Sequence, residues 1–103
     1  MAETIEIEKL QRSANEACQL LKTLGNSDRL LLICEISRGE RCVGELQDRL
    51  GIQQPTLSQQ LTILRNEGLV NTRRDGKQIF YSLSSTKALD ILNALYKSYC
   101  KSN

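Results

Sequence analysis

The sequence predicts a mainly helical domain that carries one β-hairpin in its second half. Apolar residues recur at helical spacing over most of the chain. Two β-like runs are joined by Asp75-Gly76, a pair that favours a hairpin turn. The length of 103 residues corresponds to a single domain, 1–103. A core of this size is marginal alone, and shared burial in a dimer is a common remedy.

The first two helices are expected in the N-terminal third of the chain. Residues 7–24 place apolar side chains at helical spacing, and Gly25 is expected to end this helix as its αL residue. Asn26 or Ser27 then caps a second helix that runs to about Ser37. Apolar residues cover most of its circumference, which indicates burial on several sides.

Two further helices follow at close spacing. A short helix is expected over 43–50, before Gly51, and another over 55–67, before Gly68. Pro55 suits the first position of the second of these helices, N1, where its missing N–H costs nothing. A short helix, a tight Gly-containing turn and a second helix have helix-turn-helix spacing.

The hairpin follows directly, with strands expected over 69–74 and 77–83. In this position it forms a wing, so the elements together predict a winged helix-turn-helix. A last helix, capped by Ser84 or Ser85, is expected to end near Cys100. Its apolar band is too wide for one side of a small domain. We expect the surplus to form a homodimer surface, with the first helix as its partner.

The fourth helix and the wing carry side chains suited to double-stranded DNA. With the leucines at 57, 61 and 64 against the core, Gln59 points outward. Gln can pair with adenine, Ser and Thr can bond bases or phosphates, and a helix N-terminus offers unpaired N–H groups to phosphate. Arg and Lys at a wing tip suit the minor groove or the backbone. The candidate DNA-binding residues are Gln53, Gln54, Thr56, Ser58, Gln59, Gln60, Arg73, Arg74, Lys77 and Gln78. Each feature alone is equally typical of a solvated surface; their order and spacing favour DNA binding.

The composition of the chain excludes several classes of protein and favours others. Residues 1–52 carry seven basic and nine acidic side chains, whereas residues 53–103 carry seven basic and three acidic, and such a basic half suits a polyanion. The absence of histidine excludes His-dependent catalysis and a mixed Cys/His zinc site. No Gly-rich phosphate loop is present, so neither an enzyme nor a cofactor is expected. No apolar run is long enough to span a membrane, and the acidic N-terminus lacks a signal-peptide core, so we expect a cytoplasmic protein without a membrane partner.

The cysteines, Cys18, Cys34, Cys42 and Cys100, form no C-x-x-C pair, and a cytosolic setting disfavours structural disulfides. Cys34 ends the apolar run of the second helix, and taken alone it is interpreted as core packing. Cys18 lies on the apolar stripe of the first helix and is interpreted in the same way.

The chain resembles the ArsR-type (ArsR/SmtB) bacterial repressors over nearly its whole length. The segments that carry the resemblance are "LLKTLGNSDRLLLIC", "VGELQDRLGIQQPTLSQQLTILRNEGLV" and "TRRDGKQIFYSL". The resemblance implies a repressor that binds operator DNA as a homodimer paired through its first and last helices. At the third helix, where many members bind metals through C-x-C, this sequence has Cys42 alone and Gly44 at the second position. No metal site is therefore expected, although a metal-responsive repressor that uses only thiolates stays open.

A closer resemblance is to the dithiol branch of this family, which responds to persulfides or oxidants. It rests on "QPTLSQQL" in the fourth helix, "KQIFY" in the wing and "NALYKSYC" at the end of the last helix. By this resemblance Cys34 and Cys100 are the sensor pair, which becomes linked by a disulfide or polysulfide and releases DNA. Two further functions stay open: that of an anti-repressor and that of a small thiol-exchange or sulfur-carrier protein.

Overall fold

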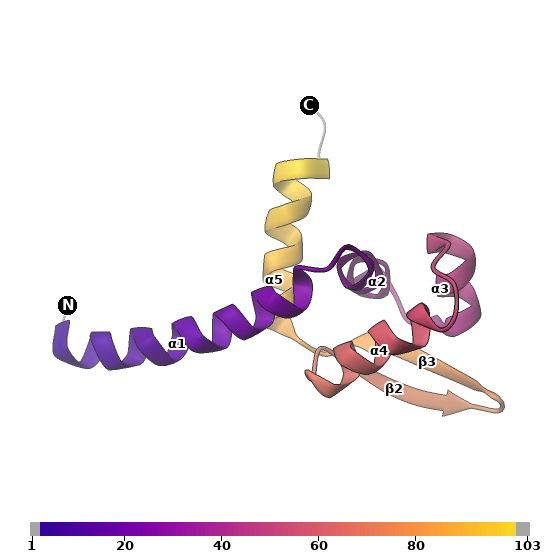
Figure 1. Cartoon of the computed structure of the whole chain (residues 1–103), viewed down its shortest axis with the longest axis horizontal. Helices are drawn as coiled ribbons and strands as arrows, with labels where there is room; N and C mark the ends of the chain where they lie inside the picture. The colour runs from indigo at the N-terminus through magenta and orange to yellow at the C-terminus, as the bar shows by residue number, and fades with distance from the viewer. Residues whose placement is uncertain (1–2, 101–103) are drawn as a thin grey trace.

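The computed structural model describes residues 3–100, so the predicted domain of 1–103 reaches beyond the described residues at both ends (Figure 1). Within this range the chain is mostly helical, with a small antiparallel sheet. The elements in order are α1 (Glu3–Leu24), α2 (Ser27–Ser37), β1 (Arg41–Cys42), α3 (Val43–Leu50), α4 (Thr56–Asn66), β2 (Val70–Asp75), β3 (Gln78–Leu83), α5 (Thr86–Leu95) and a π-helical turn (Tyr96–Cys100). None of the helices in this part of the chain is long and apolar enough to cross a bilayer.

The junction between α1 and α2 confirms one prediction and corrects another. Asn26 caps α2, since its Oδ1 accepts the backbone N–H of Arg29 at 3.0 Å. Gly25 does not adopt the αL conformation that the sequence suggested, because its φ is not positive. A Cβ at Gly25 would instead lie 3.1 Å from the carbonyl oxygen of Leu21, so this close backbone approach favours glycine here.

Helix α4 begins one residue later than predicted. Pro55 is its N-cap rather than its first helical residue, because the Pro55 carbonyl accepts the first helical bond, from Gln59 N–H at 3.1 Å. The helix also finishes one residue before the predicted end, at Asn66 with Glu67 as its C-cap, and Gly68 follows as predicted with a φ of 76°.

The wing is an antiparallel hairpin whose loop residues are Gly76 and Lys77, one position later than predicted. Asp75 pairs with Gln78 across the turn. Gly76 has a φ of 66°, and a glycine at the first loop position is typical of a type II′ turn.

A third strand, β1, was not predicted. It has only two residues, and it pairs with the middle of β3 through Arg41 opposite Tyr81. The strand order is β1-β3-β2, so β1 closes one edge of the wing sheet. Such a short strand has no pattern of its own, and only the distant β3 defines it.

The last helix also departs from the expected regular helix. Ser85 caps α5, as its Oγ accepts the N–H of Ala88 at 3.0 Å. After Leu95 the chain continues as a π-helical turn up to Cys100. Turns of this kind are rare, and they occur often at functional sites.

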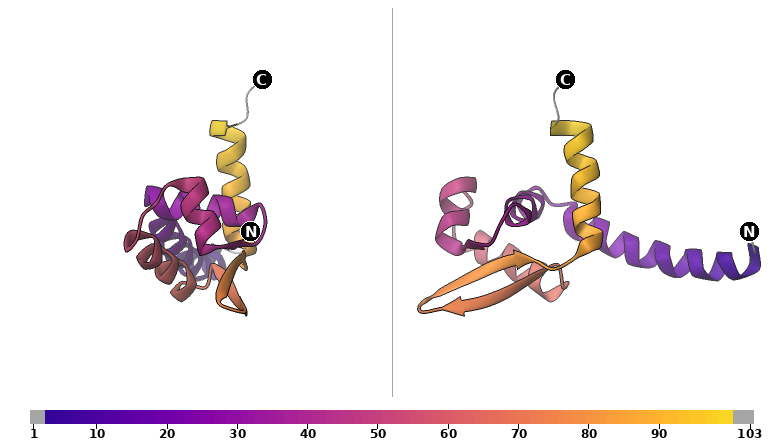
Figure 2. Two further views of the ribbon diagram at one scale, coloured as in Figure 1. Left: turned by 90° about the vertical axis from the view of Figure 1, so that its right-hand side faces the viewer. Right: turned by 180° about the vertical axis from the view of Figure 1, so that it is seen from behind.

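Helix α2 is the centre of the core. It lies between α3, α4, the wing and the start of α5, whereas α1 and the rest of α5 extend away from this body (Figures 1 and 2). The buried apolar side chains that form the core are Leu24, Leu32, Ile33, Ile36, Leu46, Ile52, Leu57, Leu61, Leu64, Leu69, Val70, Ala88 and Leu92.

An ion-pair cluster holds three elements of the body together. Glu35 of α2, whose side chain is only 12% exposed, contacts Arg41 of β1 at 3.0 Å and Arg49 of α3 at 3.2 Å, both through Oε2. Because Glu35 is sheltered from water, these contacts are screened less than pairs on an open surface. The residue next to Cys34 is thus linked to the wing and to the helix-turn-helix.

Candidate DNA-binding surface and thiol pair

Helix α4 presents a polar face to solvent and an apolar stripe to the core. Leu57, Leu61 and Leu64 are at most 1% exposed, as the helical spacing predicted. Ser58 and Gln59, on the other side, are exposed. The helix lies against the base of the hairpin, so α4 and the wing are neighbours in the body (Figure 1).

The N-terminus of α4 differs from the expected set of unpaired N–H groups. Gln54 folds back over it, and its Oε1 accepts the N–H of Ser58 at 3.1 Å and the Ser58 hydroxyl at 2.7 Å. The N–H of Leu57 bonds the carbonyl of Gln53 at 3.0 Å. The amide of Gln54 supplies the cap that proline lacks, so a phosphate could reach the N–H of Ser58 only by displacing it.

Two candidates on α4 are less exposed than the rest, Thr56 and Gln60. The Oε1 of Gln60 accepts a hydrogen bond from the Arg29 guanidinium at 2.8 Å. This directs the amide oxygen of Gln60 toward α2, and away from the side on which Gln59 is exposed. Sequence reasoning missed Arg29, because nothing local marks a contact that spans 31 positions.

In the wing, Arg73 is already engaged within the protein. Its Nε and Nη2 donate to the two carboxylate oxygens of Glu40 at 2.8 and 2.7 Å, and its guanidinium lies 4.7 Å from the centre of the Phe80 ring. These hydrogen bonds lower the pKa of Glu40 and raise the pKa of Arg73, so both groups stay charged.

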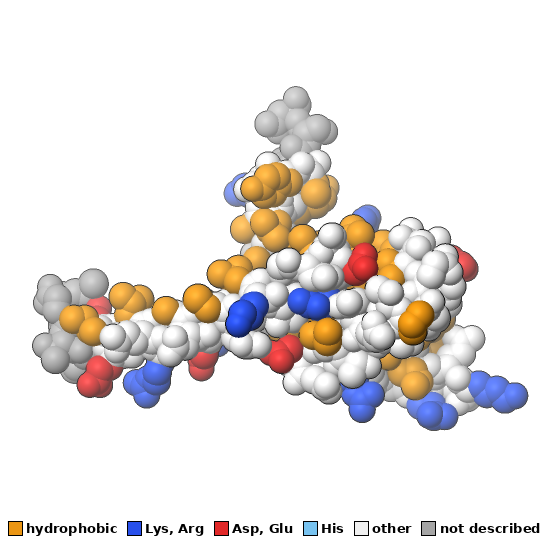
Figure 3. Space-filling model, viewed as in Figure 1, with side chains coloured by type: hydrophobic (Ala, Val, Ile, Leu, Met, Phe, Trp, Pro, Cys, Tyr) orange, Lys and Arg blue, Asp and Glu red, His pale blue; other side chains and the backbone are white. Residues whose placement is uncertain are grey.

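The remaining wing candidates are exposed. Arg73 pairs with Phe80 and Arg74 with Ile79, so the two arginines project from opposite faces of the hairpin. Lys77 is in the turn, next to Gln78. Lys and Arg side chains gather at this end of the molecule (Figure 3), which suits contact with a phosphate backbone.

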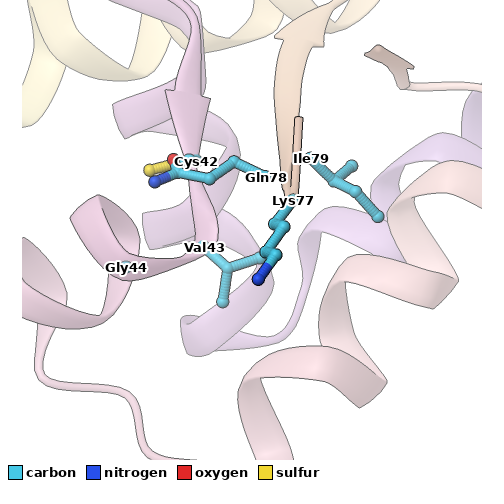
Figure 4. A pocket seen from close by; sticks show the side chains of 6 residues that line it. All are labelled: Cys42, Val43, Gly44, Lys77, Gln78 and Ile79. Carbon is cyan, nitrogen blue, oxygen red and sulfur yellow. The ribbon is translucent and has the colours of Figure 1, made fainter. Parts of the chain in front are cut away.

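A shallow hollow of about 350 Å³ lies where the wing meets α3 (Figure 4). Cys42 forms its edge and is the N-cap of α3, with its backbone N–H bonded to Glu45 Oε1 at 3.0 Å, a bond that lowers the pKa of Glu45. The Cys42 sulfur and the Lys77 amine point in different directions (Figure 4). Between residues 3 and 100, no three Cys, Asp or Glu side chains come together in a metal-binding arrangement.

The two candidate sensor thiols differ in their exposure to solvent. Cys34 is half-buried against the core, whereas Cys100 is exposed at the end of the π-helical turn, and both are free thiols. Burial raises the pKa of the Cys34 thiol, and the negative charge of Cys100 raises it further.

Helix α1 and the last helix expose apolar side chains. On α1, Ile7, Leu10 and Leu21 are 53 to 68% exposed, and Tyr99 near the end of the chain is 83% exposed. Cys18, expected to pack, is exposed as well. Hydrophobic side chains line the edge of α1 that faces α5, and also α5 itself, whereas charged groups lie along the opposite edge of α1 (Figure 3). An uncovered apolar surface of this kind is typical of a protein–protein interface.

Comparison with known proteins identifies the family. Residues 26–72 match the family described as "Bacterial regulatory protein, arsR family". The chain is 53% identical to the biofilm growth-associated repressor of Xylella fastidiosa over 93 residues, which is 90% of this chain and 82% of that protein. It is 38% identical to the transcriptional activator HlyU of Vibrio cholerae over 99 residues, covering 96% and 92% of the two chains.

A solved structure agrees with these matches. The crystal structure of the transcriptional repressor BigR from Xylella fastidiosa superposes with a TM-score of 0.86 at 52% identity, covering 92% of this chain and 97% of that one. The matches extend over the helix-turn-helix, the wing and both flanking helices. The chain therefore belongs to the arsR family of bacterial regulatory proteins and has the family's winged helix-turn-helix fold.

Proposed function

We propose that this protein is a homodimeric repressor that binds operator DNA when Cys34 and Cys100 are reduced and releases it when they become linked. The observation that supports the proposal is a pair of free thiols with different surroundings, Cys34 half-buried on the core helix α2 and Cys100 exposed in the π-helical turn, with the charge of Cys100 raising the pKa of Cys34. Regulators of similar sequence carry the name repressor, which supports the first half of the proposal.

Operator binding is assigned to the exposed face of α4 and to the wing. Ser58 and Gln59 read base edges, while Arg74 and Lys77 contact the backbone or the minor groove. The other candidates, Gln53, Gln54, Thr56, Gln60, Arg73 and Gln78, support this surface from its margins. Two copies joined through the apolar faces of α1 and the last helix read two half-sites.

The chemistry of release is a two-electron oxidation of the thiol pair. With a low-molecular-weight persulfide, RSSH, the two cysteine thiols form a disulfide and the persulfide is reduced to RSH and H₂S. Cys100 reacts first because it is exposed, whereas burial keeps Cys34 protonated. Cys34 then attacks the modified Cys100 sulfur and closes the bridge.

Bridging changes DNA affinity through α2. The bridge joins the π-helical turn to α2, and Glu35, next to Cys34, contacts Arg41 and Arg49. A coupling of about 1–3 kcal/mol between the two states corresponds to roughly 5- to 150-fold weaker binding.

The test uses a DNA duplex enriched from a random library by the reduced wild-type protein. Glutathione persulfide should weaken binding of the wild type and reduce its intact mass by two hydrogens per pair. Cys34→Ser and Cys100→Ser should bind the duplex normally and keep binding after the same treatment. Cys18→Ser and Cys42→Ser are matched controls that should release DNA as the wild type does. Normal release by either Cys34→Ser or Cys100→Ser would exclude this pair as the sensor.

The name of HlyU, a transcriptional activator, favours a second candidate function, an anti-repressor that displaces another DNA-binding protein from its site. Transcription from a promoter that carries the enriched sequence separates the two. A repressor lowers transcription with purified polymerase alone. An anti-repressor raises it only when a competing DNA-binding protein is present. A repressor that senses metals through thiolates alone predicts instead that Zn(II), Cd(II) or As(III) weakens binding by the reduced protein.

A further inference from the structure

Arg29 of α2 contacts both α1 and α4. The proposed function requires these three helices to keep fixed positions relative to one another. The backbone N–H of Arg29 is held by Asn26 at the start of α2. Its side chain donates in two directions, from Nε to the carbonyl oxygen of Thr23 at 2.6 Å and from Nη1 to Oε1 of Gln60 at 2.8 Å. Thr23 is in the last turn of α1, and Gln60 is in the middle of α4. One guanidinium thus connects the end of α1 to the helix that faces DNA.

The Thr23 end of this connection is well placed for a cation. Thr23 is only 4% exposed, and its carbonyl is among the last in α1, where helix carbonyls lack intrahelical partners and the helix dipole is negative. The planar guanidinium offers several donors in a fixed geometry, so it can satisfy this carbonyl and Gln60 together.

The hydrogen bond to Gln60 restricts the rotation and sliding of α4, which apolar packing alone permits. The apolar stripe holds α4 against the core, but apolar contact is non-directional and permits small rotations and slides of a helix. A hydrogen bond weakens steeply when its angle changes. A second bond of this type joins α1 to the end of α4, from Gln19 Nε2 to Glu67 Oε1 at 3.0 Å. The middle of α4 is thus held to α1 through Arg29 of α2, and its end is held to α1 directly.

We propose that Arg29 is a positioning residue for sequence-specific DNA binding, which it serves by fixing α4 relative to α1 through Gln60. The inference rests on the proposed function, in which α4 reads bases and α1 forms part of the dimer surface. In this proposal Arg29 itself does not touch DNA. Gln60 contributes to specificity by its hydrogen bond to Arg29, and not by a contact of its own with DNA.

The test is a double-mutant cycle with Arg29→Met, Gln60→Met and the double variant. Binding is measured to the duplex enriched by the wild type and to a scrambled duplex of equal length, over a range of salt concentrations. Each single variant should bind the enriched duplex about tenfold more weakly, the size expected for one hydrogen bond to a charged group. The double variant should bind no more weakly than either single one. Affinity for the scrambled duplex and the salt dependence should not change.

Several results overturn the inference. If the losses of binding free energy in the two single variants add up in the double variant, Gln60 contacts DNA independently of Arg29. A salt slope reduced by roughly 0.9 shows that Arg29 contacts a phosphate. Wild-type affinity in Arg29→Met shows that the connection has no role. Arg38→Met, at the exposed end of α2, removes the same charge and should bind as the wild type does.

Two controls keep the outcomes apart. Thermal unfolding checks that each variant is folded. If Arg29→Met is not, Arg29→Lys replaces it in the cycle, because Lys keeps the charge but lacks the fork that joins Thr23 to Gln60. A wild-type protein that enriches no sequence contradicts the proposed function itself. If the wild type binds the enriched duplex and the Arg29 and Gln60 variants bind it equally well, only the role of Arg29 is contradicted.

Discussion

The body of the molecule (α2, α3, α4 and the wing) buries most of its apolar side chains, whereas its two helical extensions (α1 and the last helix) expose several of theirs. In the body, the side chains of α2 and α4 that face the core are buried, and polar groups such as Glu35 have partners within the fold. Along α1 up to Gln19 the side chains from 7 onward are exposed, and apolar ones are among them. The body therefore has a complete core of its own, whereas the extensions expose apolar surface that a second copy would cover.

The largest expected effect is a difference in stability between the body and α1 when leucine is replaced by alanine in each. Leu61→Ala removes a side chain that is 1% exposed, and it should destabilise the protein by about 2–5 kcal/mol. Leu10→Ala removes one that is 68% exposed, and it should leave the unfolding free energy of the monomer nearly unchanged. Urea unfolding at protein concentrations below the dimer dissociation constant measures both. Equal losses would show that α1 packs onto its own body.

The second effect concerns the surface of α1. Leu10→Asp places a charge on the apolar edge, and it should weaken self-association by at least about 2 kcal/mol, since the carboxylate would be buried without a partner. Arg12→Gln changes the net charge equally on an exposed residue about 200° further round the helix, and it should leave association unchanged. Sedimentation equilibrium gives both constants. A Leu10→Asp protein that dimerises normally would place the interface elsewhere.

How much of this comparison could be predicted from sequence depends on the range of each interaction. The buried stripe of α4 followed from residue spacing alone, and the hairpin followed from Asp75-Gly76 between two β-like runs. The cap made by Gln54 was missed, because an expected Pro55 at N1 hid the need for a side-chain acceptor.

Contacts across long sequence separations could not be predicted. Strand β1 exists only because β3 lies beside it, and the bonds from Arg29 to Gln60 and from Arg73 to Glu40 join residues about thirty positions apart. The proposed pairing of Cys34 with Cys100 rests on family resemblance, since neither residue carries a local signal for the other.

The third effect joins the two regions, since Cys34 belongs to the body and Cys100 to an extension. At pH 7.5 iodoacetamide should modify Cys100 on the order of tenfold faster than Cys34, because Cys100 is exposed and burial raises the pKa of Cys34. The raised pKa keeps Cys34 protonated at neutral pH, so its rate should still be rising above pH 9, whereas an unperturbed thiol would be levelling off. Peptide mass spectrometry over a pH series measures both rates. A Cys34 rate that levels off near neutral pH would contradict the effect of burial.

The smallest effect compares two neighbours in the wing. Arg74→Gln should reduce the slope of log affinity against log salt by roughly 0.9, the value expected for one phosphate contact. Arg73→Gln should change the slope less, because Arg73 already neutralises Glu40. Fluorescence anisotropy with the enriched duplex resolves the two slopes. A larger change for Arg73→Gln would mean that Glu40 gives up Arg73 when DNA binds.

Strand β2 has a consequence for the behaviour of the protein in concentrated solution. It is an outer strand of the sheet, and five of its six residues are exposed. An open strand edge invites pairing with another chain, which short strands and charged side chains discourage. Arg73 and Arg74 therefore also protect the hairpin from edge-to-edge aggregation. Variants that neutralise both should lose solubility as well as affinity for DNA, and the two losses need separate assays.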